Sequence, residues 1–251
     1  MLLTTGRLPL CHGFSTREGG VSEGPFASLN LGRSVGDEPA RVAENARRLA
    51  ARVGLTPSQL VCANQVHGER LLEVETATPG VDMPPAIGDA DGLFTRARRV
   101  ALCIRTADCV PVLLYAPEVP AIAAVHAGWR GAVLSIPGKA VAELGNRYGA
   151  VPARMLAAIG PSIRSCCYEV GEEVAAQFEA RFGPGLTVRC AGEGPRLDLV
   201  EACRRSLMAV GVQGCNIDVL PHCTACSPAL FFSHRRDQGR SGRHLSFLAL
   251  D

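Results

Sequence analysis

Three apolar runs that follow one another closely constrain the fold of this chain more than any other feature. They read VALCIRT (100–106), VPVLLY (110–115) and AIAAVHA (121–127), and few of their residues are polar. Nearly continuous apolar runs of this length are typical of strands buried on both faces. Such strands need a covering layer on each side, so we expect one α/β domain with a mixed sheet.

Two helices can be bounded from local signals. Apolar side chains recur on one face from 39 to 53, with Pro39 suited to the first turn and Gly54 to the end. A second helix is expected over 128–148, where Pro137 should kink or split it. Further strands are expected at 60–67 (LVCANQVH), 70–76, 155–160 and 215–220, and further amphipathic helices at 172–183 and 198–211.

The remaining segments have the composition of loops. Residues 12–36 are rich in Gly, Ser and Asn, which predicts a long polar loop, and long loops in compact domains are often functional. The C-terminal residues 231–250 predict two strands around a basic, glycine-rich turn. Pro84–Pro85 and residues 190–195 are expected to be surface loops.

Composition limits the classes of partner. The 251 residues are 47% hydrophobic and 20% charged, which supports a substantial core and argues against disorder. A net charge of +2 gives no sign of a nucleic-acid or membrane partner. No apolar run approaches the roughly 20 residues of a membrane span, and the N-terminus does not resemble a signal peptide. The eleven cysteines are irregularly spaced and fit reduced thiols or metal ligands, so we expect a soluble, cytoplasmic protein.

A His-Cys-His set is the first candidate site. His67, Cys109 and His126 each lie at or near the end of a predicted strand, where side chains from different strands can meet. Imidazole and thiolate suit zinc or copper, and three protein ligands with an open fourth position are typical of a catalytic metal. The same residues allow a different interpretation, in which Cys109 and His126 form a nucleophilic pair oriented by Asp108 or Asn64.

Other clusters have weaker signals. Cys223 and Cys226 form a CxxC, but a structural zinc site needs two more ligands, and His234, the nearest candidate, is not at a standard spacing. The adjacent Cys166 and Cys167 cannot readily form a strain-free disulfide. Asp91 fits either a polar strand end or a site residue. Four arginines could hold a phosphate or carboxylate, although each also fits a solvated surface: Arg17, Arg130, Arg235 and Arg236.

A series of motifs in a fixed order resembles the YfiH/laccase-domain family. The resemblance runs from about His12 to Phe247, and the motifs together are far more specific than any one alone. They are HGFSTREGGVS, SLNLG, GDEPARVAEN, NQVHG, ADGLFT, RTADCVPVLL, AVHAGWRG, AIGPSIRSCCYEVG and CTACSPALFFSHRRDQGRSGR.

The resemblance implies a fold and a metal site. The expected fold is a single-domain, layered α-β-β-α sandwich over 1–251 with mixed sheets, related to the catalytic domain of the necrotizing toxins. The expected metal ligands are His67, Cys109 and His126, with zinc favoured and copper as the alternative. Only six histidines are present, too few and too scattered for the several copper sites of a blue-copper oxidase.

Members of this family have been called purine nucleoside phosphorylases, peptidoglycan editing factors and multicopper polyphenol oxidases. The resemblance therefore implies a zinc-dependent phosphorylase acting on adenosine, inosine and S-methyl-5′-thioadenosine, with adenosine deaminase activity. Cys109 and Asp108 are the expected catalytic residues, and Arg17, Asn64, Arg130, Arg235 and Arg236 the expected substrate or phosphate ligands. The alternatives are a cysteine-type hydrolase acting on muropeptide precursors and a copper-dependent phenol oxidase.

Overall fold

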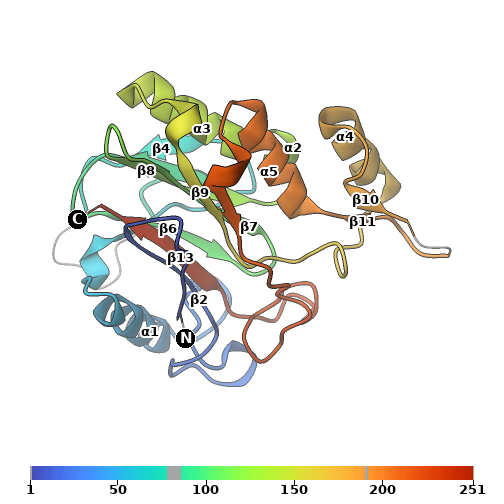
Figure 1. Ribbon diagram of the computed structural model, residues 1–251. Coiled ribbons are helices and arrows are strands. Elements are labelled where there is room, and N and C mark those ends of the chain that lie inside the picture. The colour runs from blue at the N-terminus through green and yellow to red at the C-terminus, as the bar shows by residue number, and fades with distance from the viewer. Residues whose placement is uncertain (1, 78–85, 190–191, 251) are drawn as a thin grey trace.

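The protein is built on two β-sheets that pack face to face between helices (Figure 1). The computed structural model describes residues 2–77, 86–189 and 192–250, so the predicted loop at Pro84–Pro85 and the first two residues of the one at 190–195 lie outside the described residues. The five-stranded sheet has the order β1 (Leu2–Leu3), β2 (Cys11–Ser15), β13 (His244–Ala249), β6 (Ala101–Thr106), β3 (Leu60–Cys62). The six-stranded sheet has the order β12 (Ile217–Val219), β9 (Leu156–Ile159), β7 (Val110–Ala116), β8 (Ala121–Ala127), β5 (Gly92–Thr95), β4 (Leu71–Glu73).

Both sheets are mixed, as expected. In the five-stranded sheet β3 runs parallel to β6, while β6 and β2 run antiparallel to β13. In the six-stranded sheet β12 is parallel to β9 and β4 to β5, while β7 is antiparallel to both β8 and β9. The three apolar runs are confirmed as β6, β7 and β8, which are buried almost throughout.

Alternation along the strands produces three apolar layers. Leu102 and Ile104 of β6 face the second sheet, where Leu113 of β7 and Ile122 of β8 meet them. The intervening Cys103 faces the opposite way, toward helix α1 (Pro39–Arg52). Residues that alternate across a strand point to opposite faces, so one buried strand contributes to two cores.

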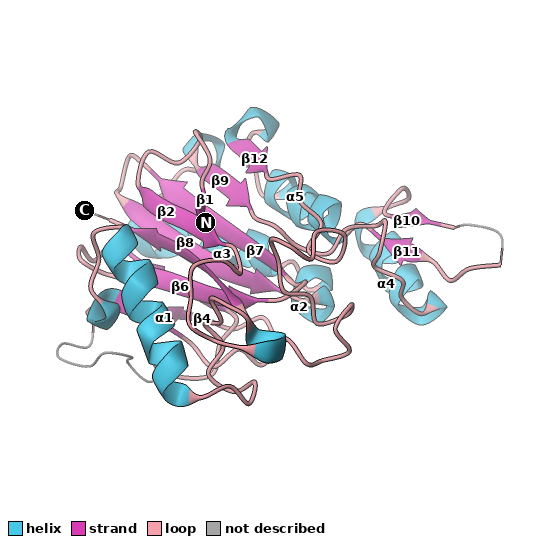
Figure 2. Ribbon diagram, turned by 90° about the horizontal axis from the view of Figure 1, so that it is seen from below, coloured by secondary structure: helices cyan, strands magenta, loops and turns pink. Residues whose placement is uncertain are grey.

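Helices cover the outer faces of the two sheets. α3 (Ile136–Tyr148) and α5 (Leu199–Ala209) pack on the six-stranded sheet, and α1 packs on the five-stranded sheet, which gives an α-β-β-α arrangement. α4 (Glu172–Phe182) and the two-stranded sheet of β10 (Thr187–Val188) and β11 (Arg196–Leu197) lie at one end, beyond α5 (Figure 2). No helix among the described residues is long and apolar enough to span a bilayer.

The predicted break at Pro137 is confirmed. α2 (Trp129–Val133) ends before Ser135, whose φ of 60° turns the chain, and α3 begins at Ile136 with Pro137 in its first turn. Proline is tolerated there because the first N–H groups of a helix have no intrahelical partner.

Three predictions about strands need correction. The strand expected at 60–67 ends at Cys62, so His67 lies in a loop. The polar loop expected from residue 12 begins only after β2, because Cys11–Ser15 pair with β13. Of the two strands expected at the C-terminus, only β13 forms. Phe231 and Phe232, in the place of the other, are buried but lie outside any strand.

His244 explains how the phenylalanine pair is held. The Phe232 backbone N–H donates to Nε2 of His244 at 2.8 Å, and the His244 ring lies against both phenylalanine rings. Burial lowers the pKa of His244 to about 3. The ring is therefore neutral in the folded protein, as an acceptor of this hydrogen bond must be.

Candidate active site

The His-Cys-His set lies where the chain crosses from one sheet to the other. Residues 107–109 join β6 of the five-stranded sheet to β7 of the six-stranded sheet, and Asp108 has a φ of 89° in this sharp turn. Residues 63–70 make a second crossing, from β3 to β4, and carry His67, whose φ is 59°. His126 is the penultimate residue of β8 and pairs with Pro111 at the start of β7.

The two crossings and the end of β8 bring the three side chains together. One potential ligand atom from each of His67, Cys109 and His126 lies within 4.8 Å of the others, and the two imidazole rings meet edge to face at 4.9 Å. His126 is buried, Cys109 is half-buried and His67 is exposed, so the cluster has one side open to solvent. An N₂S donor set at this spacing fits a borderline metal such as zinc and leaves a coordination position free.

Asp91 organises this cluster from behind. It is fully buried, and its Oδ1 lies 2.8 Å from Nδ1 of His126, which leaves Nε2 of that ring for a metal or a proton. The same carboxylate accepts the backbone N–H groups of Val66 (3.3 Å), His67 (3.0 Å) and Gly68 (2.6 Å). A buried carboxylate that holds one histidine by its ring and another by its backbone fixes the relative position of both. Nothing in the sequence separates this role from that of a polar strand end.

The site also sets the protonation of its own residues. Burial raises the pKa of Cys109, but attraction to His126 and hydrogen bonds from His126 and His67 outweigh it and lower the pKa to about 6. Burial lowers the pKa of His126, but Cys109 and Asp91 outweigh it and raise the pKa to about 9. Burial likewise raises the pKa of Asp91, and its hydrogen bonds from His126 and Gly68 bring it below the ordinary value. Cys109 is thus a thiolate near neutral pH, the form that binds metals and attacks electrophiles.

Asp108 faces away from this thiolate network. Its Oδ1 accepts from Oγ1 of Thr224 at 2.6 Å, and its Oδ2 accepts from Oγ of Ser233 at 3.0 Å and from the backbone N–H of Arg235 at 2.7 Å. These bonds anchor the loop before β13 to the turn that carries Cys109. The proton-transfer role expected of Asp108 stays a prediction.

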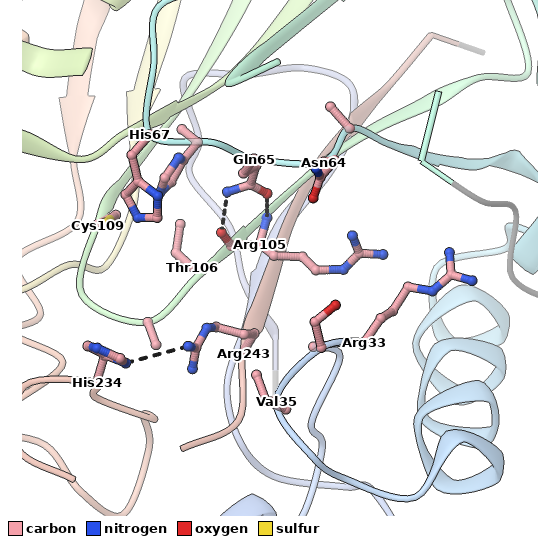
Figure 3. A pocket seen from close by; sticks show the side chains of 15 residues that line it. Arg33, Val35, Asn64, Gln65, His67, Arg105, Thr106, Cys109, His234 and Arg243 are labelled. Carbon is pink, nitrogen blue, oxygen red and sulfur yellow. Dashed lines mark hydrogen bonds between the residues drawn. The ribbon is translucent and has the colours of Figure 1, made fainter. Parts of the chain in front are cut away.

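A pocket of about 310 Å³ opens beside the three metal-ligand candidates (Figure 3). Arg33 and Arg243, from two loops, and Arg105, from β6, line it, and the Gln65 side chain bonds both backbone groups of Arg105, at 2.7 and 2.8 Å. Pockets of a few hundred Å³ with convergent polar groups are typical of sites for small ligands. Arg105 and Arg243 are within the family-like motifs, but nothing in their spacing distinguishes them from other arginines.

Of the residues predicted to bind substrate or phosphate, one lines this pocket and four lie outside its lining. Asn64 lines this pocket, and its side chain donates to Asp89 at 2.8 Å. Arg17 donates to the carbonyls of Ala27 and Pro228, and Arg236 donates to Asp237 and to the carbonyls of Thr224, Ala225 and Phe231. Arg235 stacks on Tyr168 beside a second, more open pocket, and exposed Arg130 stacks on Trp129. The phosphate-binding role of these four arginines stays a prediction.

The CxxC has partners that the sequence did not indicate. His234 lines the pocket beside the three metal-ligand candidates and lies 3.5 Å from Arg243, so it is not a ligand of a CxxC site. Cys166 and Cys167 instead approach Cys223 and Cys226, with potential ligand atoms of all four within 4.8 Å of one another.

Comparison with known proteins shows the family of this chain. The family model described as "Multi-copper polyphenol oxidoreductase laccase" matches residues 11–251. The chain belongs to this YfiH/laccase-domain family. The purine nucleoside phosphorylase YlmD of Geobacillus stearothermophilus is 40% identical over 94% of this chain and 88% of its own. A purine nucleoside phosphorylase of Deinococcus radiodurans is 42% identical over 99% of this chain and 92% of its own.

Solved structures of the YfiH/laccase-domain family have the same fold. The crystal structure of the hypothetical protein YfiH of Bacillus licheniformis superposes with a TM-score of 0.91 at 36% identity. It covers 96% of this chain, which covers 92% of that one. The α/β fold with mixed sheets is therefore that of the YfiH/laccase-domain family.

Proposed function

We propose that this protein is a zinc-dependent purine nucleoside phosphorylase acting on adenosine, inosine and S-methyl-5′-thioadenosine, with adenosine deaminase activity. The observation that carries the proposal is the near full-length similarity, at 40–42% identity, to two proteins named purine nucleoside phosphorylase. The pocket beside His67, Cys109 and His126 supports it, because its volume suits a small ligand. We further propose that residues 1–251 form one catalytic domain; the relation to the necrotizing toxins stays a prediction.

Zinc is proposed because the donor set fits it. Two imidazoles and one thiolate make a mixed set, and the open side of the cluster leaves room for a substrate atom. When bound, zinc acts as a Lewis acid and supports the attack on purine C6 that deamination requires. His67, Cys109 and His126 would hold it, while Asp91 keeps the Nδ1 proton on His126 and so leaves Nε2 available.

Phosphorolysis requires a bound phosphate beside the sugar. A phosphate oxygen forms a bond to C1′ as the C1′–N9 bond breaks, and the departing purine carries off the bond's electron pair and gains a proton. Arg33, Arg105 and Arg243 are proposed to hold the phosphate, since guanidinium groups bind oxyanions bidentately.

A cysteine-type hydrolase that edits peptidoglycan precursors is the second candidate. It is favoured by the order Cys109–His126–Asp91, in which a thiolate, an imidazolium and a buried carboxylate follow one another. A metal-bound thiolate cannot be a free nucleophile, so the two candidates are mutually exclusive at any one time. Copper-dependent phenol oxidation, from the family description, is a third outcome that would follow copper loading and dioxygen.

Product analysis distinguishes these functions. The purified protein is incubated with adenosine or inosine, with and without phosphate, before and after removal of metal by a chelator. We expect phosphate-dependent release of adenine and hypoxanthine, and loss of inosine formation from adenosine after chelation. The Cys109→Ser variant should be inactive, while the Cys215→Ser variant, an exposed thiol outside the site, should match the parent protein. Unchanged nucleosides from a zinc-loaded protein would reject the phosphorylase and direct the search to muropeptide amides.

A further inference from the structure

Four cysteines from two loops converge away from the pocket. Cys166 and Cys167 lie between β9 and α4, and Cys223 and Cys226 lie between β12 and β13. The Cys226 sulfur lies 3.3 Å from that of Cys167 and 3.5 Å from that of Cys166, and all four sulfurs lie within 4.8 Å of one another. With Zn–S bonds of about 2.3 Å, the sulfurs of a tetrahedral site stand about 3.8 Å apart. The cluster therefore has the dimensions of a four-thiolate cage.

The sheet brings these loops together. β9 and β12 are parallel neighbours, so their carboxyl ends leave the sheet side by side and lead into the two cysteine loops (Figure 1). The pairing continues beyond the strands, with a parallel bridge between Ser162 and Cys223 and a 3.1 Å bond from the Thr224 N–H to the Ser162 carbonyl. The cysteines thus lie on backbone that is already fixed, which lowers the conformational cost of assembling a metal site.

The charge around the cluster suits bound thiolates. A Zn²⁺ ion with four thiolates carries a net charge of about −2. The Arg236 guanidinium donates to the carbonyls of Thr224 (2.9 Å) and Ala225 (3.3 Å), the two residues between Cys223 and Cys226. A cation in this position offsets part of the negative charge. Each thiol releases its proton to solvent when the metal binds.

We propose that Cys166, Cys167, Cys223 and Cys226 bind one zinc ion as a closed, structural site. Four protein ligands leave no open position, so this ion takes no part in catalysis. It ties together two loops that support the catalytic region, because Thr224 binds the Asp108 carboxylate at 2.6 Å and Asp108 precedes Cys109. This site is separate from the proposed catalytic one and does not depend on its function.

Oxidation is the competing use of the same sulfurs. A disulfide requires about 2.05 Å between two sulfurs, and none of the described cysteines is in a disulfide. The adjacent Cys166 and Cys167 also present both sulfurs to Cys226, which suits a shared ion better than a single bond. The test must therefore separate metal from disulfide.

Metal counting tests the proposal. The full chain is purified without added reductant and with oxygen excluded, and zinc per chain is measured by elemental mass spectrometry together with the intact mass. We expect two zinc ions in the parent protein and in the control Cys215→Ser, and one in each of Cys226→Ser and Cys109→Ser. Cys109→Ser loaded with Co²⁺ should still show thiolate-to-cobalt charge-transfer bands and a tetrahedral d–d spectrum. Both should be absent from the double variant that also carries Cys226→Ser.

The stoichiometries separate the two sites. If the parent protein and Cys226→Ser each hold one zinc and Cys109→Ser holds none, the four-cysteine site is overturned. If the parent protein and Cys109→Ser each hold one zinc and Cys226→Ser holds none, the four-cysteine site is supported and the proposed catalytic metal is rejected. An intact mass two hydrogens short, with no second ion, would establish a disulfide instead. If Cys226→Ser does not fold, Cys166→Ser replaces it. If neither folds, the zinc content of Cys109→Ser decides: one ion supports the four-cysteine site and none overturns it.

Discussion

The Asp91→Asn substitution tests how the structure builds its metal site. Asp91 Oδ1 accepts from His126 Nδ1 and the His67 N–H, and Oδ2 accepts from the Val66 and Gly68 N–H groups. Asparagine keeps the shape but has only one oxygen. Whichever way the amide turns, its NH₂ group faces one pair of donors and leaves them without an acceptor.

The size of the effect follows from these contacts. Loss of an outer partner of a ligand histidine typically weakens metal binding by about 10–100-fold, or roughly 1.4–2.7 kcal/mol. Leaving buried donors unsatisfied costs a further ~1–3 kcal/mol of folding stability. We therefore expect Asp91→Asn to bind zinc at the catalytic site at least about tenfold more weakly and to unfold at a lower urea concentration.

Competition with a chromophoric chelator measures the zinc affinity, and urea denaturation of the metal-free protein measures stability. Asp89→Asn is the matched control, because Asp89 is a nearby exposed carboxylate whose side chain accepts a bond from the Asn64 side chain. Both assays should be done in the Cys226→Ser background, so that one site is counted. If Asp91→Asn and Asp89→Asn bind zinc equally tightly, Asp91 does not position the ligands and the proposed architecture of the site is wrong.

Two further predictions concern the site's packing and the buried histidine. A Cβ at Gly128 would stand 3.0 Å from His67 Cδ2 and 3.4 Å from Cys109 Sγ, whereas one at Gly171, also a helix N-cap, would meet nothing within 4 Å. Gly128→Ala should therefore weaken zinc binding by about 1 kcal/mol, roughly fivefold, and Gly171→Ala should not; equal affinities in the chelator assay would contradict this. The folded-state pKa of His244, about 3, lies below its unfolded value of about 6.5, so the stability gained by keeping it neutral is present above about pH 6.5 and is lost as the pH falls toward 3. Between pH 7 and pH 5, the free energy of unfolding measured in urea should fall by about 2 kcal/mol less in His244→Gln than in the parent protein. Equal decreases would show that this histidine does not stay neutral.

Much of the local structure could be predicted from the sequence. The apolar runs of β6, β7 and β8, the split at Pro137 and the ends of α4 and α5 depend on neighbouring residues, whose hydrophobic period and hydrogen-bonding capacity are visible in the chain itself. The prediction that the strand extends to His67 is wrong, because the apolar pattern on which it was based continues past Cys62, where the strand ends. There, Asp91 captures the backbone N–H groups that a strand would have paired.

The sequence alone determined the succession of helices and strands and, through its ordered motifs, the family and the candidates His67, Cys109 and His126. Only the tertiary structure decided that Asp91 stands behind His126, that Arg105 and Arg243 border the pocket, and that Cys166 and Cys167 meet Cys223 and Cys226. The physical reason is that these contacts depend on strand order. β9 lies beside β12, and the chain passes between sheets on either side of β6, so residues far apart in sequence become neighbours through long-range pairing that no local pattern encodes.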